Sequence, residues 1–91
     1  MARIQTQSTT TSYGSALTLH ASTTQAEVSF LKSGSLVAGT IKITDPGDNA
    51  IEIPIGADQT YTFVLPRGTS DGWSVKLKAA AAGAPTGQLL E

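Results

Sequence analysis

Two short runs of alternating apolar and polar residues flank a turn in the middle of the chain, and they constrain the fold more than any other feature. Residues 41–44 read Ile-Lys-Ile-Thr, and residues 51–55 read Ile-Glu-Ile-Pro-Ile. Successive side chains of a β-strand point to opposite faces of its sheet, so this period of two, rich in β-branched residues, predicts half-buried strands. Residues 45–49 predict a turn between them. We expect type II, in which Pro46 fixes φ at the first central position and Gly47 takes a positive φ at the second.

The same two runs also predict how the strands align. Placing Ile43 opposite Ile51 keeps the isoleucines on one face and puts Lys42 opposite Glu52 on the other. This register satisfies the core face and the solvent face together, which is how register is normally specified. Pro54 has no N–H to donate to a neighbouring strand, so we expect the second strand to lie at a sheet edge or to end in a bulge.

Similar short runs continue along the chain, and no window shows helical spacing with caps. About seven or eight short strands with regular turn signals predict one all-β domain, a small antiparallel β-sandwich of the jelly-roll or immunoglobulin-like kind. We expect residues 61–65 and 73–77 to form a second hairpin, with Phe63 opposite Val75. The predicted core consists of Ile41, Ile43, Ile51, Ile53, Tyr61, Phe63, Leu65, Trp73, Val75 and Leu77.

The composition argues against several classes of function. Only 14% of the 91 residues are charged and the formal net charge is -1, so there is no basic surplus to neutralise a nucleic-acid backbone. No run approaches the roughly 18 apolar residues of a membrane span, and none follows the first residues as in a signal peptide. We therefore expect neither nucleic acid nor membrane as a partner. We also expect a product that stays in the cytoplasm where it is made or leaves it inside a particle.

Side chains suited to catalysis or metal binding are few. There is no cysteine, and His20 is the only histidine. On a strand whose Leu17 and Leu19 point inward, His20 should point outward, and no nucleophile or carboxylate is placed to act with it. Asp45, Asp48 and Asn49 could contribute to a calcium site, but Asp and Asn also stabilise turns by bonding the local backbone, which is the interpretation that we prefer. We expect no enzyme, no metal and no cofactor.

Two other features could contact a ligand or a partner. Trp73 and Tyr61 could form a platform for sugar rings, although their alternation with apolar residues favours a place in the core. The loop of residues 66–72, with Arg67 near its tip, is a candidate for an exposed contact, and a merely solvated loop is the alternative.

The two terminal segments are the remaining candidates for an interface. Residues 1–12 carry no charge after Arg3, so they can add to a neighbouring sheet edge without burying charge. Residues 80–91 pass through small residues to the apolar pair Leu89-Leu90, which precedes Glu91 and has no assigned core role. We expect both segments to be assembly arms, and the alternative is that they pair within their own domain. The predicted interface residues are Arg3, Ile4, Gln5, Arg67, Leu89 and Leu90.

The short, cysteine-free chain rich in Ser, Thr, Ala and Gly resembles the small capsid decoration (cement) proteins of tailed phages. The resemblance extends over most of the chain and includes residues 53–63, which read Ile-Pro-Ile-Gly-Ala-Asp-Gln-Thr-Tyr-Thr-Phe. It implies a virion protein, assembled in the host cytoplasm, that forms a dimeric or trimeric knob and bridges major capsid subunits. The alternatives are a tail, baseplate or fibre component, a carbohydrate-binding or adhesive module, and a filament subunit that uses donated strands.

Overall fold

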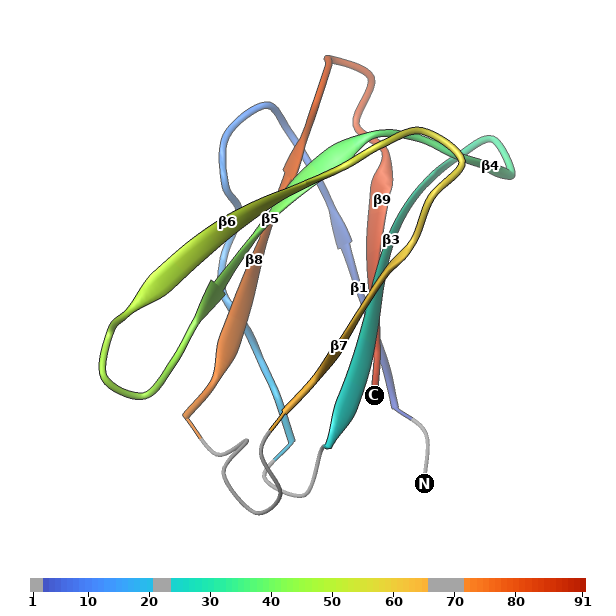
Figure 1. The fold of residues 1–91 in the computed structure, drawn as a ribbon. Helices are drawn as coiled ribbons and strands as arrows, with labels where there is room; N and C mark the ends of the chain where they lie inside the picture. Colours follow the sequence, from blue (N-terminus) through green and yellow to red (C-terminus); the bar gives the residue numbers. More distant parts are fainter. Residues whose placement is uncertain (1–2, 21–23, 66–71) are drawn as a thin grey trace.

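The computed structural model describes residues 3–20, 24–65 and 72–91, and in this part of the chain it has nine strands and no helix. Two antiparallel sheets pack against each other as a small β-sandwich, which confirms the predicted fold class (Figure 1). The number exceeds the expected seven or eight because two of the strands have only two residues. The strands are β1 (Ile4–Ser8), β2 (Leu17–Thr18), β3 (Gln25–Lys32), β4 (Ser35–Leu36), β5 (Gly39–Thr44), β6 (Ala50–Ile55), β7 (Tyr61–Val64), β8 (Ser74–Ala79) and β9 (Thr86–Leu90).

Each sheet combines strands from both halves of the chain. In the first, which we call sheet A, β9 lies between β1 and β3, and β4 and β7 pair with the opposite side of β3. In the second, sheet B, the order is β2-β8-β5-β6. The first and last strands are therefore neighbours, and β1 is an edge strand of sheet A.

The central hairpin has the predicted register. Ile43 lies opposite Ile51, and Lys42 lies opposite Glu52. Among the described strands β6 pairs only with β5, so Pro54 lies on an edge strand, as predicted.

The turn of this hairpin differs from the predicted type II. Gly47 does not have a positive φ, whereas Asp48 does (64°), and the N–H of Asp48 donates to the Asp45 carbonyl at 3.1 Å. This is the arrangement of a type I turn followed by a left-handed residue. The Asp45 carboxylate stabilises it, because its Oδ1 accepts the N–H groups of Gly47 and Asn49, both at 2.9 Å. The aspartate thus acts as a turn residue, as we preferred.

The predicted second hairpin is wrong, because β7 and β8 lie in different sheets. Phe63 on β7 is opposite Ala26 on β3, and Val75 on β8 is opposite Ile43 on β5. Tight hairpins have loops of about two to five residues. The connection from Val64 to Ser74 is longer, so it does not force the two strands to pair, and it crosses from one sheet to the other.

The core lies between the two sheets and contains most of the predicted residues. Ile53, Tyr61 and Trp73 are half-buried at its margin. Ile51 is 61% exposed, so its predicted place in the core is wrong. Ile51 is the second residue of β6, next to the turn, and this end of the β5–β6 hairpin projects away from sheet A (Figure 1). The buried apolar residues of the core cluster are Leu19, Ala26, Val28, Phe30, Ile41, Ile43, Ile55, Phe63, Leu65, Val75, Leu77 and Leu89.

Candidate functional site

The two terminal segments pair with each other inside their own domain. Ile4 lies opposite Leu90, and Ser8 lies opposite Thr86. Leu89 is fully buried because it lies on the inner face of β9, between the sheets. Its predicted place at an interface is therefore wrong, and residues 80–91 contribute a core strand.

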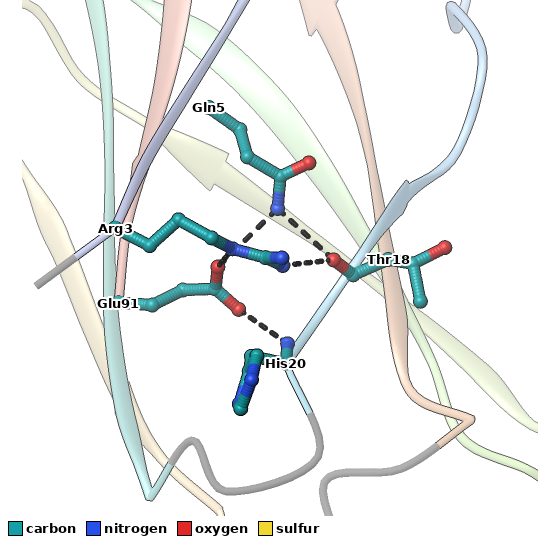
Figure 2. Close-up of polar contacts among 5 residues, drawn as sticks. All are labelled: Arg3, Gln5, Thr18, His20 and Glu91. Carbon is teal, nitrogen blue, oxygen red and sulfur yellow. Dashed lines mark hydrogen bonds and ion pairs between the residues drawn. The ribbon is translucent and has the colours of Figure 1, made fainter. Parts of the chain in front are cut away.

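A polar cluster fixes these strands to the other sheet (Figure 2). Arg3 Nε donates to Glu91 Oε2 at 2.5 Å, and Arg3 Nη2 donates to the Thr18 carbonyl at 2.8 Å. Gln5 Nε2 donates to the same carbonyl at 2.9 Å and to Glu91 Oε2 at 3.3 Å. The backbone N–H of His20 donates to Glu91 Oε1 at 2.7 Å. Arg3 and Gln5, both predicted at an interface, thus make contacts within the chain that tie the first and last strands to β2.

The outer surface of sheet A is almost uncharged. Its residues follow from the alternation of the strands, because their neighbours point into the core. Among the described residues its only charged member is Glu27, whose carboxylate accepts a hydrogen bond from the Thr62 hydroxyl at 3.4 Å. We call this surface the neutral face, and its exposed and half-buried residues on β1, β3, β7 and β9 are Ile4, Thr6, Ser8, Gln25, Glu27, Leu31, Thr62, Val64, Thr86, Gln88 and Leu90.

Apolar side chains on the neutral face are accessible. Val64 is 76% exposed and Ile4 is 61% exposed. Ile4 and Leu90, both predicted interface residues, lie directly opposite each other on neighbouring strands. They line a shallow open depression of about 330 Å³, whose lining is completed by Arg3, Gln25, Ala26, Glu27 and Glu91. Three of the predicted interface residues, Arg3, Ile4 and Leu90, are therefore brought together around one depression.

The outer surface of sheet B has the opposite character. Lys42 and Lys76 lie directly opposite each other on β5 and β8, and Lys78 follows on β8. Two ammonium groups lie near the Tyr13 ring, with Lys78 Nζ 4.7 Å and Lys42 Nζ 5.6 Å from the ring centroid. We call this surface, with Glu52, the lysine face.

A tyrosine–carboxylate hydrogen bond spans the lysine face. The Tyr13 hydroxyl donates to Glu52 Oε1 at 2.5 Å. Burial, together with this hydrogen bond and the charge of Glu52, raises the pKa of Tyr13 to about 12. The same bond holds the pKa of Glu52 below its usual value, with smaller contributions from Lys78 and Lys42. No pattern in the sequence predicts this contact, because Tyr13 stands alone in a run of mostly Ser and Thr.

The aromatic rings do not form the flat exposed platform on which a sugar would stack. Tyr61 and Trp73 are half-buried against the core, and the Tyr61 ring stacks on Phe63 with centroids 6.0 Å apart. Phe30 is fully buried. The other predicted contact, Arg67, lies outside the described residues.

Comparison with known proteins adds no family to this description. No protein-family model, curated protein or solved structure matches the chain. Residues 3–20, 24–65 and 72–91 contain no group of three or more His, Cys, Asp or Glu side chains placed to hold a metal ion. Nor do those residues form any helix long and apolar enough to cross a membrane. The two outer faces and the sheet edges are therefore the features through which the described part of the chain could recognise a partner.

Proposed function

We propose that the chain is a structural assembly protein of the capsid decoration type, which packs its neutral face against protein subunits of a larger particle. The observation that carries the proposal is the contrast between the two faces. Apart from Glu27, the neutral face presents hydroxyl, amide and apolar side chains, whereas the lysine face presents three ammonium groups.

A face with so little charge is suited to burial against another protein. Moving a charge out of water is costly unless a partner compensates it, and the centres of protein interfaces are depleted of charged residues. The exposed side chains of Ile4 and Val64 add apolar area that binding would remove from water. The lysine face, in contrast, is suited to remain in solvent.

The partner in this proposal is a major capsid protein, or another virion protein, contacted in the assembled particle. The role needs no catalytic group, no cofactor and no nucleic acid. The carbohydrate-binding alternative is less favoured, because it requires an exposed aromatic ring and the described rings are buried or half-buried.

On this proposal a tailed phage encodes the chain, and cosedimentation with the capsids of that phage is the test. The Val64→Lys variant places a charge on the neutral face at a side chain that makes little contact with the core. Ile51→Lys is the matched control, because it makes the same kind of change at an exposed residue of sheet B. Both should change the free energy of unfolding by no more than about 0.5 kcal/mol, as exposed sites usually do.

We expect the wild-type protein and Ile51→Lys to sediment with the capsids at the same occupancy and Val64→Lys to stay in the supernatant. A wild-type protein that ignores the capsids contradicts the proposal. Capsid binding that survives Val64→Lys but is lost in Ile51→Lys would assign the contact to sheet B instead.

A further inference from the structure

The free edge of β1 presents backbone groups that no strand of its own sheet uses. Arg3 and Glu91 exchange both of their backbone hydrogen bonds, at 3.1 and 2.8 Å. Because such pairs alternate along an antiparallel ladder, every second residue of β1 directs its N–H and C=O towards β9. The intervening residues, Ile4, Thr6 and Ser8, direct their N–H and C=O groups away from β9, at the free edge of the sheet. Sheet A ends at β1 in the described part of the chain.

This edge lacks the features that normally prevent pairing with another chain. Protected edge strands carry charges, proline or bulges. The edge strand β6 of sheet B has two of these features, Glu52 and Pro54. β1 reads Ile-Gln-Thr-Gln-Ser and pairs with β9 over five consecutive residues without a bulge. The β1 strand therefore has no bulge, no charged residue and no proline.

The side chains beneath β1 hold it in place. Gln5 Nε2 donates to the Thr18 carbonyl at 2.9 Å, and Gln7 Nε2 donates to the Ser15 carbonyl at 3.0 Å. Arg3 is fixed by Glu91, as Figure 2 shows. An edge that is already ordered loses little conformational entropy when another strand pairs with it.

We propose that β1 pairs antiparallel with β1 of a second copy of this chain, about a twofold axis at Thr6. Thr6 then faces Thr6 of the partner subunit, and Ile4 faces Ser8 of the partner subunit. In this register all three outward residues form hydrogen-bonded pairs. The two A sheets become continuous, and their neutral faces join into one surface.

A second copy fits this edge better than a different strand for two reasons. The strand is uncharged, so identical strands meet without the repulsion that like charges cause when they lie directly opposite. The residues whose backbone groups point to the free edge, Ile4, Thr6 and Ser8, are also placed symmetrically about Thr6. In a twofold dimer, one register therefore pairs all three of them from each copy. The pairing uses the edge and not the face, so it does not rest on capsid binding.

Light scattering after size-exclusion chromatography, over a range of protein concentrations, tests the pairing. The wild-type protein should be a dimer. Thr6→Lys and Thr6→Glu each place like charges opposite each other, and each should raise the dimer dissociation constant at least roughly tenfold. An equimolar mixture of the two variants should restore a dimer, because opposite charges then face each other. Thermal unfolding of each variant confirms that the exposed Thr6 site tolerates the change.

Val64→Lys is the control that separates this inference from the proposed function. This variant should remain a dimer, because Val64 lies on β7, and β9 and β3 separate β7 from β1 in sheet A. A monomeric wild-type protein overturns the pairing, and so does a dimer that both Thr6 variants leave intact. A mixture that stays monomeric overturns the twofold register at Thr6. Loss of the dimer in Val64→Lys alone would assign self-association to the neutral face and overturn the edge model.

Discussion

The carboxylate of Glu91 lies 2.5 Å from Arg3 Nε, although 88 positions separate the two residues in the sequence. The Glu91 side chain is only 2% exposed, whereas that of Arg3 is 44% exposed. The same carboxylate accepts hydrogen bonds from the Gln5 side chain and from the His20 backbone. This carboxylate therefore connects β1, β9 and the segment after β2.

Glu91→Ala should destabilise the domain by about 1.5–3 kcal/mol, because it removes the charged acceptor of hydrogen bonds from Arg3, Gln5 and the His20 backbone. Glu91→Gln keeps one acceptor oxygen and the side-chain shape, so its cost should be smaller. Arg3→Ala should cost less than Glu91→Ala, because Arg3 is partly exposed and its ion pair is weakened by solvent. Urea unfolding of the three variants measures the order. An alanine variant at Glu91 that is as stable as wild type would show that the cluster does not hold the strands.

Two isoleucines of the central hairpin should respond very differently to truncation. Ile41 is fully buried, so Ile41→Ala should cost about 2–5 kcal/mol. Ile51 is 61% exposed, so Ile51→Ala should change the free energy of unfolding by no more than about 0.5 kcal/mol. If chemical denaturation shows that both variants lose the same free energy of unfolding, Ile51 belongs to the core after all.

The features that were predicted correctly are those that neighbouring residues determine. The register of the β5–β6 hairpin follows from alternation on both sides of a short turn, and Lys42 faces Glu52 as expected. The edge position of Pro54 follows from the missing N–H of proline. The turn type was wrong, although its location was right. The choice between Gly47 and Asp48 for the left-handed position depends on how the Asp45 carboxylate folds back on the loop.

The features that were missed depend on residues far apart in the sequence. Alternation shows that β7 is a strand, but it does not show that its partner is β3 and not β8. Leu89 had no visible role because its core neighbours come from other strands. The contacts of Glu91 and Tyr13 join segments separated by long stretches of chain, and no local pattern marks them. The neutral face likewise emerges only when β1, β3, β7 and β9 are placed side by side.

Gly39 is required by the close approach of an aromatic ring. A Cβ at this position would lie 2.5 Å from the Phe30 ring. Gly39→Ala should therefore destabilise the domain, because the fully buried ring of Phe30 has little room to move. In a double-mutant cycle, Gly39→Ala should cost much less in a Phe30→Ala background, where the ring is absent. Additive losses in thermal unfolding would show that another contact restricts this site.

The turn carboxylate should make stability depend on acidic pH. Hydrogen bonds from the backbone of Asn49, and also from its side chain and from Gly47, lower the pKa of Asp45. A lowered native pKa adds stability above the unfolded value, near 3.9, and this stability is lost as the pH falls through the native pKa. Asp45→Asn keeps a side-chain acceptor for the turn but does not titrate. Its stability should fall less steeply in acid than that of wild type, and identical acid profiles would contradict this.

The Tyr13–Glu52 hydrogen bond should make stability depend on alkaline pH in the opposite sense. Burial and the contact with Glu52 raise the native pKa of Tyr13 to about 12, from an ordinary value of 10.0. A raised native pKa adds stability that is fully present below about pH 10 and is lost as the pH rises towards about 12. Tyr13→Phe keeps the ring near Lys78 and Lys42 but removes the ionising hydroxyl. Urea unfolding across this range should therefore show a steeper loss for wild type than for Tyr13→Phe, since the other alkaline groups are common to both. The ultraviolet titration of the folded proteins should differ by one tyrosine that ionises near pH 12, and a difference centred near pH 10 would show that the hydroxyl is not held by Glu52.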